Sequence, residues 1–272
     1  MWVKDYRVTS STSPSNPDTT QTAPDRRYRR LRIFNGSMGA LHFAQAIAIL
    51  ALANDFSLPV TATFLQDAPG ASAPALNELF QFRLAWGVAG FLFISAAAHW
   101  IVASPGVFRW YQHNLERNRN YARWVEYSIS ASLMIVLIAL LTGSGDVGAL
   151  LGLFGVNASM ILFGLLMEHY EEPGEANWMS YSFGVIVGIF PWVVIALYLW
   201  SPSTSASPPT FVYGIFVSLF IFFNSFAVNM VLQYKRVGPW RDYLFGESVY
   251  VLLSLTSKSA LAWQVFSGTL AG

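Results

Sequence analysis

Apolar residues fall along this chain in seven long runs, and most polar and charged residues lie between them. Each run has about twenty residues or more, enough for a helix to cross a hydrocarbon core of about 30 Å at about 1.5 Å per residue. The pattern therefore predicts seven membrane-spanning helices in one compact bundle. Their expected ranges are residues 33–53, 79–103, 121–142, 147–168, 178–200, 211–234 and 243–270.

Two polar segments near the N-terminus carry further structural signals. The segment between the first two runs, residues 54–77, contains "LPVTATFLQ" followed by "DAPGASAP". Alternating β-branched residues closed by turn residues predict a short β-hairpin or strand in this first loop. Residues 1–25 are rich in Ser, Thr and Pro and lack the apolar core of a signal peptide. We expect residues 1–30 to form a disordered tail and residues 31–272 one transmembrane domain.

The composition supports a membrane protein and excludes a soluble globular domain. Hydrophobic residues make up 54% of the chain and charged residues only 11%, whereas a soluble domain carries about a quarter charged residues. The chain has no cysteine, which excludes disulfides, thiolate chemistry and cysteine-based metal sites. The net charge of +1 says little about partners, and we expect membrane lipids and no nucleic acid.

Basic residues lie almost entirely on one side of the predicted bundle. Fourteen of the 16 lysines and arginines fall in the N-terminal segment, the second loop and the sixth loop. The positive-inside rule then places the N-terminus in the cytoplasm and the C-terminus outside, in the plasma membrane. The fourth loop, "HYEEPGEAN", is acidic although it is assigned inside, but acidic residues contribute little to this rule.

One lysine lies inside an apolar run. Lys258, in "SLTSKSALAW", is twelve residues from the nearer end of the last run, or about 18 Å at about 1.5 Å per residue. Its side chain cannot reach the membrane surface from there. A charge at that depth costs about 2.5–3.5 kcal/mol on insertion scales, so Lys258 must be neutral, paired or covalently modified. A buried lysine is also a candidate Schiff-base former.

Glu126 is the acidic residue that packed helices can bring against Lys258. It lies in "RWVEYSIS" of the third run, whereas Glu247 is about 16 Å from Lys258 along the helix axis and Glu168 is at the end of a run. Arg123 lies on the same helix face as Glu126, one turn away. An ion pair in a transporter or another helical bundle is the alternative. The six phenylalanines of "FVYGIFVSLFIFFNSFAVNMV" favour a cavity for a long apolar ligand over an ion path.

These motifs resemble those of the heliorhodopsins, a branch of the microbial rhodopsins. The resemblance covers the chain from about Leu31 to its end. It implies an all-α membrane protein with a seven-helix rhodopsin-like bundle and the inverted orientation expected above. It rests on Lys258 in the last run, Ser254 four residues earlier where other microbial rhodopsins usually have Asp, Glu126 as the sole counterion, and the intramembrane histidines His42 ("ALHFAQ") and His99 ("AAAHWI").

The resemblance also implies a chromophore and its surroundings. It implies all-trans-retinal bound covalently to Lys258 as a protonated Schiff base, with Glu126 as counterion and Ser254 close to the linkage. It further implies that the retinal is contacted by, or lies near, Tyr127, Met160, Ile161, Phe226, Asn157 and Gln233. A polar cavity with His42, His99 and Arg123 would hold the proton after it leaves the Schiff base. Alternatively, each histidine only bonds a neighbouring helix.

Family analogy favours a homodimer. The pairs Gly148/Gly152 and Gly184/Gly188 have the GxxxG spacing of close helix contacts. Either pair would form a dimer face or an ordinary contact within the bundle.

The sequence favours a sensor over a pump. Outward proton pumps carry a carboxylate donor three turns beyond the counterion, and Leu137 takes that position here. We therefore predict a photosensory receptor in which light isomerises retinal and the Schiff base loses its proton. A cytoplasmic signalling partner or lipid would then read the change, without enzymatic activity. The alternatives are a light-gated or light-driven proton or ion transporter and, outside the rhodopsins, a membrane enzyme or transporter without retinal.

Overall fold

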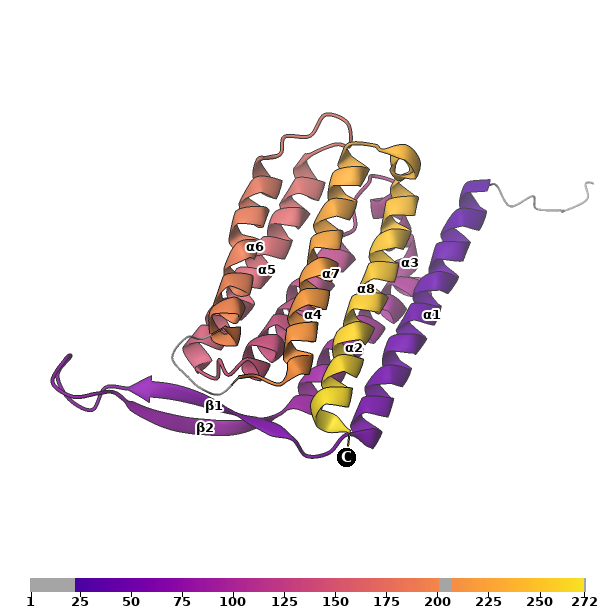
Figure 1. The fold of residues 1–272 in the computed structure, drawn as a ribbon. Helices are drawn as coiled ribbons and strands as arrows, with labels where there is room; N and C mark the ends of the chain where they lie inside the picture. The colour runs from indigo at the N-terminus through magenta and orange to yellow at the C-terminus, as the bar shows by residue number, and fades with distance from the viewer. Residues whose placement is uncertain (1–22, 201–206, 272) are drawn as a thin grey trace, which may run out of the picture.

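The computed structural model describes residues 23–200 and 207–271. Within these residues, seven long helices stand side by side in one bundle, and a β-hairpin crosses one end of it (Figure 1). The predicted fold class is therefore confirmed. The helices of the bundle are α1 (Ala23–Leu52), α2 (Leu84–Ala103), α4 (Tyr121–Leu141), α5 (Val147–Tyr170), α6 (Met179–Leu199), α7 (Thr210–Tyr234) and α8 (Tyr243–Val265).

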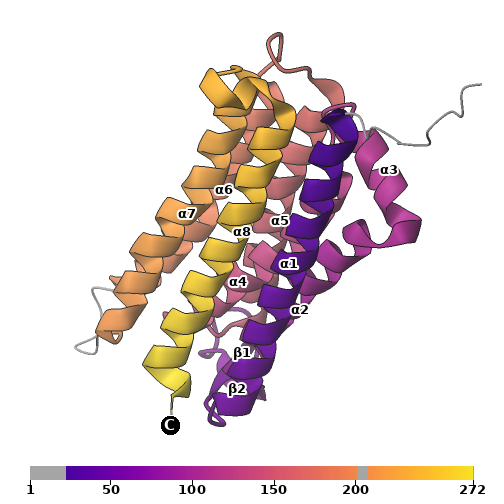
Figure 2. The ribbon, with the colours of Figure 1, turned by 90° about the vertical axis from the view of Figure 1, so that its right-hand side faces the viewer.

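Six of these described helices are long and apolar enough to cross a membrane, and α8 is not among them. In lipid a helix satisfies its own backbone hydrogen bonds, which explains why apolar runs of this length fold as helices. Helix α8 is less apolar because it carries Glu247, Lys258 and several serines. It nevertheless lies in the bundle, between α7 and α1 (Figure 2).

The hairpin predicted in the first loop is confirmed. Strands β1 (Ser57–Phe64) and β2 (Ala75–Arg83) pair antiparallel, with Ser57 opposite Arg83 and an irregularity between Val60 and Thr61. The predicted second run, residues 79–103, is wrong at its start, because residues 79–83 belong to β2 and the helix begins at Leu84. An apolar stretch is compatible with the start of a membrane helix and also with a strand. Pairing with β1 makes this stretch a strand.

The hairpin is tied to the end of the bundle that it crosses. Thr61 donates its backbone N–H to the carbonyl of Gly145 in the α4–α5 loop (2.8 Å), and Asn54 donates to the carbonyl of Leu270 near the C-terminus (3.0 Å). We call this end of the bundle the hairpin end.

A short helix that the sequence did not predict, α3 (Pro105–Leu115), lies at the opposite end, called here the α3 end. It buries Tyr111 and Leu115 against Leu31 and Val102. Arg32 on α1 donates to the carbonyl of Ala103 just before α3 (2.7 Å). These contacts join α1, α2 and α3.

The predicted disordered tail, residues 1–30, is wrong for residues 23–30, which form the first turns of α1. These turns are held by packing of Tyr28 on the α3 end and by an ion pair between Arg27 and Asp242. Residues 1–22 lie outside the described residues.

The buried core has two main parts, one on each side of the middle of the bundle. A large apolar cluster reaches the hairpin end and includes Ile49, Leu84, Leu137 and Leu270. A smaller cluster toward the α3 end is rich in aromatic residues, among them Trp124 and Tyr250. The candidate site lies where these clusters meet.

Candidate functional site

Lys258 and Glu126 form a buried ion pair between α8 and α4. The Nζ of Lys258 donates to Oε1 of Glu126 (2.8 Å) and to Oγ of Ser254 (3.0 Å). Only 2% of Lys258 and 8% of Glu126 is exposed. Ser254 is one helical turn from Lys258, which places its hydroxyl beside the amine. The structure thus brings together the three residues at the centre of the sequence hypothesis.

Ser95 on α2 is a member of this site that the sequence did not reveal. Its Oγ donates to the same Glu126 oxygen that binds Lys258 (2.6 Å), and Ser95 is fully buried. A hydrogen bond to the charged carboxylate stabilises the charge inside the bundle. A single serine in an apolar run gives no sequence signal, so only the packing of α2 on α4 reveals it.

A mainly apolar cavity of about 230 Å³ opens beside the ion pair. Lys258 and Ser254 are on its wall, together with all four apolar and aromatic residues predicted to contact a chromophore. Those four are Tyr127, Met160, Ile161 and Phe226. The Nζ of Lys258 lies 5.0 Å from the centre of the Tyr127 ring. Apolar walls with one amine, whose carboxylate partner lies outside the cavity lining, fit a long apolar carbonyl compound that reacts with the amine.

The sequence did not identify an aromatic group at one side of this cavity. Trp192 on α6 makes edge-on contacts with Phe220 and Phe223 on α7, with ring centres 5.3 and 5.4 Å apart. All three rings line the cavity. The phenylalanine-rich run predicted an apolar ligand site, but the contribution of α6 depends on how the two helices pack.

Asn157 and Gln233, predicted as polar positions near the chromophore, do not line the cavity. The Nδ2 of Asn157 donates to Oγ of Ser132 (3.0 Å), so its side-chain amide forms a hydrogen bond that links α5 to α4. Gln233 lies seven residues past Phe226, about two helical turns toward the α3 end. There its Nε2 donates to the carbonyl of Tyr243 (3.3 Å).

A second, smaller cavity of about 40 Å³ lies on the α3 side of Glu126. Its lining includes Glu126, His99, Arg123 and Asn35. A space of this size with several polar groups is large enough for water. Of the three residues predicted for a polar cavity, His99 and Arg123 line it and His42 does not. The ring of His42 stacks on that of His99, with centres 5.6 Å apart.

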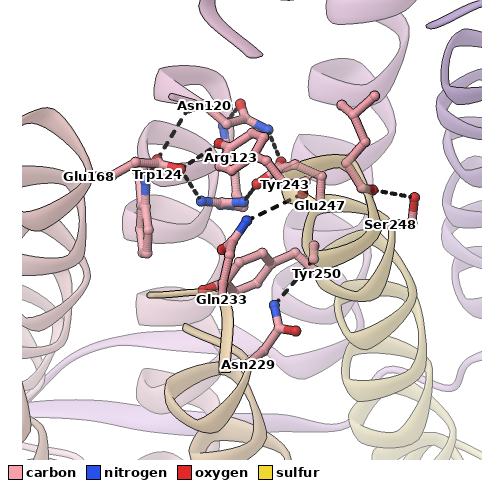
Figure 3. Close-up of polar contacts among 12 residues, drawn as sticks. Asn120, Arg123, Trp124, Glu168, Asn229, Gln233, Tyr243, Glu247, Ser248 and Tyr250 are labelled. Carbon is pink, nitrogen blue, oxygen red and sulfur yellow. Dashed lines mark hydrogen bonds and ion pairs between the residues drawn. The ribbon is translucent and has the colours of Figure 1, made fainter. Parts of the chain in front are cut away.

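Arg123 is the centre of a buried charged cluster at the α3 end (Figure 3). Its guanidinium forms ion pairs with Glu168 on α5 (2.8 Å) and with Glu247 on α8. It also lies 3.9 Å from the centre of the Tyr250 ring. Further donors satisfy the two carboxylates: Trp124 and Tyr243 donate to Glu168, and Asn120 donates to Glu247.

The sequence located these charges without predicting that they meet. Glu168 ends one predicted run and Glu247 is near the start of another. Only the packing of α4, α5 and α8 brings both to Arg123, where both carboxylates are almost fully buried. The cluster ties the three helices together near the second cavity.

A family model described as Heliorhodopsin matches residues 31–270. This chain belongs to the heliorhodopsin family. The family and the apolar helices make it a membrane protein and, in broad terms, a retinal-binding photoreceptor. The retinal chromophore is implied by the family, and the residues around Lys258 described above fit it.

Solved rhodopsin structures share the fold of this heliorhodopsin at low sequence identity. The transmembrane domain of Salpingoeca rosetta rhodopsin phosphodiesterase matches with a TM-score of 0.61 and 14% identity, over 93% of this chain and 88% of that one. A light-driven proton pump from Leptosphaeria maculans matches with a TM-score of 0.61 and 14% identity, over 90% and 96%.

Cyanorhodopsin from the cyanobacterium Tolypothrix matches less closely, with a TM-score of 0.52 and 13% identity, over 92% of this chain and 96% of that one. No curated protein sequence matches the chain. At these identities the structures support the rhodopsin fold and do not choose between an enzyme-linked protein and a pump.

Proposed function

We propose that this heliorhodopsin is a light-sensing receptor that binds all-trans-retinal covalently through Lys258 and signals without pumping ions. One observation carries the proposal: a buried amine lies 2.8 Å from a buried carboxylate, on the wall of an apolar cavity of about 230 Å³. Intramembrane ionisable residues are costly and are usually functional. Because the two charges balance each other, the buried pair is less costly than either charge would be alone.

When bound, the retinal would supply a polyene that changes shape on absorbing light. The chain supplies the electrostatics around it. Glu126 balances the positive charge at Nζ of Lys258, and two unit charges about 4 Å apart attract by about 4 kcal/mol at an effective dielectric constant of about 20. Ser95 donates to this carboxylate and Ser254 lies beside the amine. Both hydroxyls hold the charged atoms in place.

The polar groups around Lys258 favour movement of a proton toward the α3 end. Glu126 contacts Lys258 and also lines the second cavity, where His99 and Arg123 lie. On the other side of Lys258 most buried residues are apolar, including Ile135, Leu137 and Ile138, and the polar pair there, Gln264 and Ser218, carries no charge. Leu137 is fully buried at the position where pumps carry a donor. This asymmetry supports a sensor over a transporter, which is the alternative function.

The orientation and the partner belong to the same proposal. The α3 end carries the basic loops, so we propose that it faces the cytoplasm and that the N-terminus is inside. A cytoplasmic signalling partner would then meet the end that holds the Arg123 cluster. We expect no enzymatic activity from this chain.

A homodimer is also proposed, and the structure favours one of the two glycine pairs for its face. Gly188 packs against the side chain of Met160 inside the bundle, and Gly184 contacts Phe163. Gly152, in contrast, is exposed on α5 and has no side chain or foreign backbone within 4 Å of its Cβ position. The Gly148/Gly152 side of α5 is therefore the better dimer face.

The test is reconstitution of the purified full chain with all-trans-retinal. We expect a visible absorption band that is missing in Lys258→Ala and present in Lys235→Ala, which alters an exposed lysine. A visible band that persists in Lys258→Ala would overturn the chromophore assignment. Light-induced currents in cells decide between sensor and transporter: a large current abolished by an uncoupler would overturn the sensor proposal.

A further inference from the structure

Asn35 on α1 binds one nitrogen of the His99 ring. The Oδ1 of Asn35 lies 2.8 Å from Nδ1 of His99, and the Nδ2 of Asn35 donates to the carbonyl of Leu31 one turn earlier (2.9 Å). Asn35 is almost fully buried, and both Asn35 and His99 line the second cavity. These contacts fix the direction of the hydrogen bond between Asn35 and His99.

The direction follows from the donors and acceptors present. A backbone carbonyl only accepts, so the Asn35 atom facing Leu31 must be the NH₂ group. If the amide were turned over, its oxygen would face the Leu31 carbonyl oxygen at 2.9 Å without a proton between them. The oxygen of Asn35 therefore faces His99, and Nδ1 of His99 must carry the proton that it donates.

We propose that Asn35 is a positioning residue that holds neutral His99 in its Nδ1–H form and so leaves Nε2 as the atom that accepts a proton. The role in proton acceptance rests on the function proposed above, whereas the form of the ring does not. A proton arriving at Nε2 leaves the Asn35 contact unchanged, because Nδ1 donates to Asn35 both before and after. The charged ring keeps a buried partner without any rearrangement.

The same reasoning separates His99 from its neighbour His42. His42 is fully buried, and neither of its ring nitrogens has a hydrogen-bond partner among the described residues. A charge on His42 would be buried without a hydrogen-bond acceptor, which is costly. The charged groups around His99 are Glu126 and Arg123, which line the same cavity, and Lys258, which is paired with Glu126. Glu126 favours a positive charge on His99, and Asn35 supplies the acceptor.

The ring form is measurable in the full chain without retinal. Nitrogen NMR of protein labelled with ¹⁵N-histidine distinguishes a protonated ring nitrogen from an unprotonated one, and the His99 signals are those lost in His99→Phe. We expect protonated Nδ1 and unprotonated Nε2 at a pH where the ring is neutral. A neutral ring protonated at Nε2 would overturn the proposal directly.

Two variants test the role of Asn35. Asn35→Leu should lose the exclusive Nδ1–H form, because no side-chain acceptor then faces Nδ1. The matched control is Asn114→Leu on α3, since Asn114 also donates to a carbonyl one turn earlier in its own helix (2.8 Å) but lines neither cavity. An Asn35→Leu protein whose His99 signals match the wild type would overturn the positioning role. If Asn35→Leu does not fold, the ring form of the wild-type protein still decides the question.

Light-induced infrared spectra of the retinal-loaded protein separate this proposal from the proposed function. With the Nδ1–H form established, we expect illumination to produce a protonated-histidine band that is lost in His99→Phe. If the ring form is as proposed and the His99 band does not appear, proton acceptance by His99 is wrong while the positioning of the ring by Asn35 stands.

Discussion

The Nζ of Lys258 lies 2.8 Å from Oε1 of Glu126 although the two residues are 132 positions apart. The same oxygen accepts a hydrogen bond from Ser95, so α2, α4 and α8 meet at one atom. A carboxylate with both a charged and a neutral donor is held in one position. Its charge is therefore a fixed part of the surroundings of any chromophore attached to Lys258.

Removing the charge of Glu126 should shift the absorption of the retinal-loaded protein to longer wavelength. The negative charge stabilises positive charge localised at Nζ in the ground state, and Glu126→Gln removes that stabilisation. The measurement is the visible spectrum at a pH where the pigment is protonated. Ser95→Ala keeps the carboxylate and should give a smaller shift. A Glu126→Gln pigment with the wild-type maximum would exclude Glu126 as counterion.

Removing Arg123 should destabilise the protein strongly. Arg123→Met leaves the carboxylates of Glu168 and Glu247 buried without their cation, and breaking a buried ion pair costs about 3–5 kcal/mol. Thermal unfolding in detergent measures the loss. The control is Arg27→Ala, because the Arg27–Asp242 pair is half exposed and such pairs contribute about 0–1 kcal/mol. Similar unfolding temperatures for the two variants would contradict a structural role of the cluster.

The sequence revealed those parts of the site that are unusual within a single run. Lys258 and Glu126 stand out because each is a charge deep in an apolar segment, and helix geometry excludes Glu247 as the partner of Lys258. Ser95 and Asn35 do not stand out, because serine and asparagine occur in membrane helices for many reasons. Their roles depend on contacts across helices, at 2.6 Å to Glu126 and 2.8 Å to His99.

The errors in the predicted fold have similar causes. Residues 79–83 look like the start of an apolar helix, and only pairing with β1 makes them a strand. The basic residues near Arg27 look like a solvated tail, but packing of Tyr28 and the Asp242 contact extend α1 over them. The residue pattern of one segment does not reveal its contacts with other segments, whether the partner is the nearby strand β1 or Asp242, 215 positions from Arg27.

A side chain at Gly188 should hinder retinal binding. Gly188 lines the large cavity and packs against Met160, so Gly188→Val would place two methyl groups in a space that the ligand or Met160 occupies. We expect slower and less complete growth of the visible band when retinal is added. Gly152→Val is the matched control, because Gly152 lies on the same glycine spacing of another helix and faces open space. Equal rates of band growth in the two variants would contradict the assignment of this cavity to retinal.

For the oligomeric state we expect the reverse of the retinal result: a substitution at Gly152 should change it and one at Gly188 should not. If the open glycine face of α5 forms the dimer, Gly152→Leu prevents close approach of the two helices and should convert dimers to monomers. Light scattering on protein purified in detergent measures the mass, and Gly188→Val should remain a dimer because its position is used within the bundle. A wild-type monomer would contradict the homodimer itself. A Gly152→Leu dimer as stable as the wild type would place the interface elsewhere, since a leucine on each chain cannot fit between backbones in close contact.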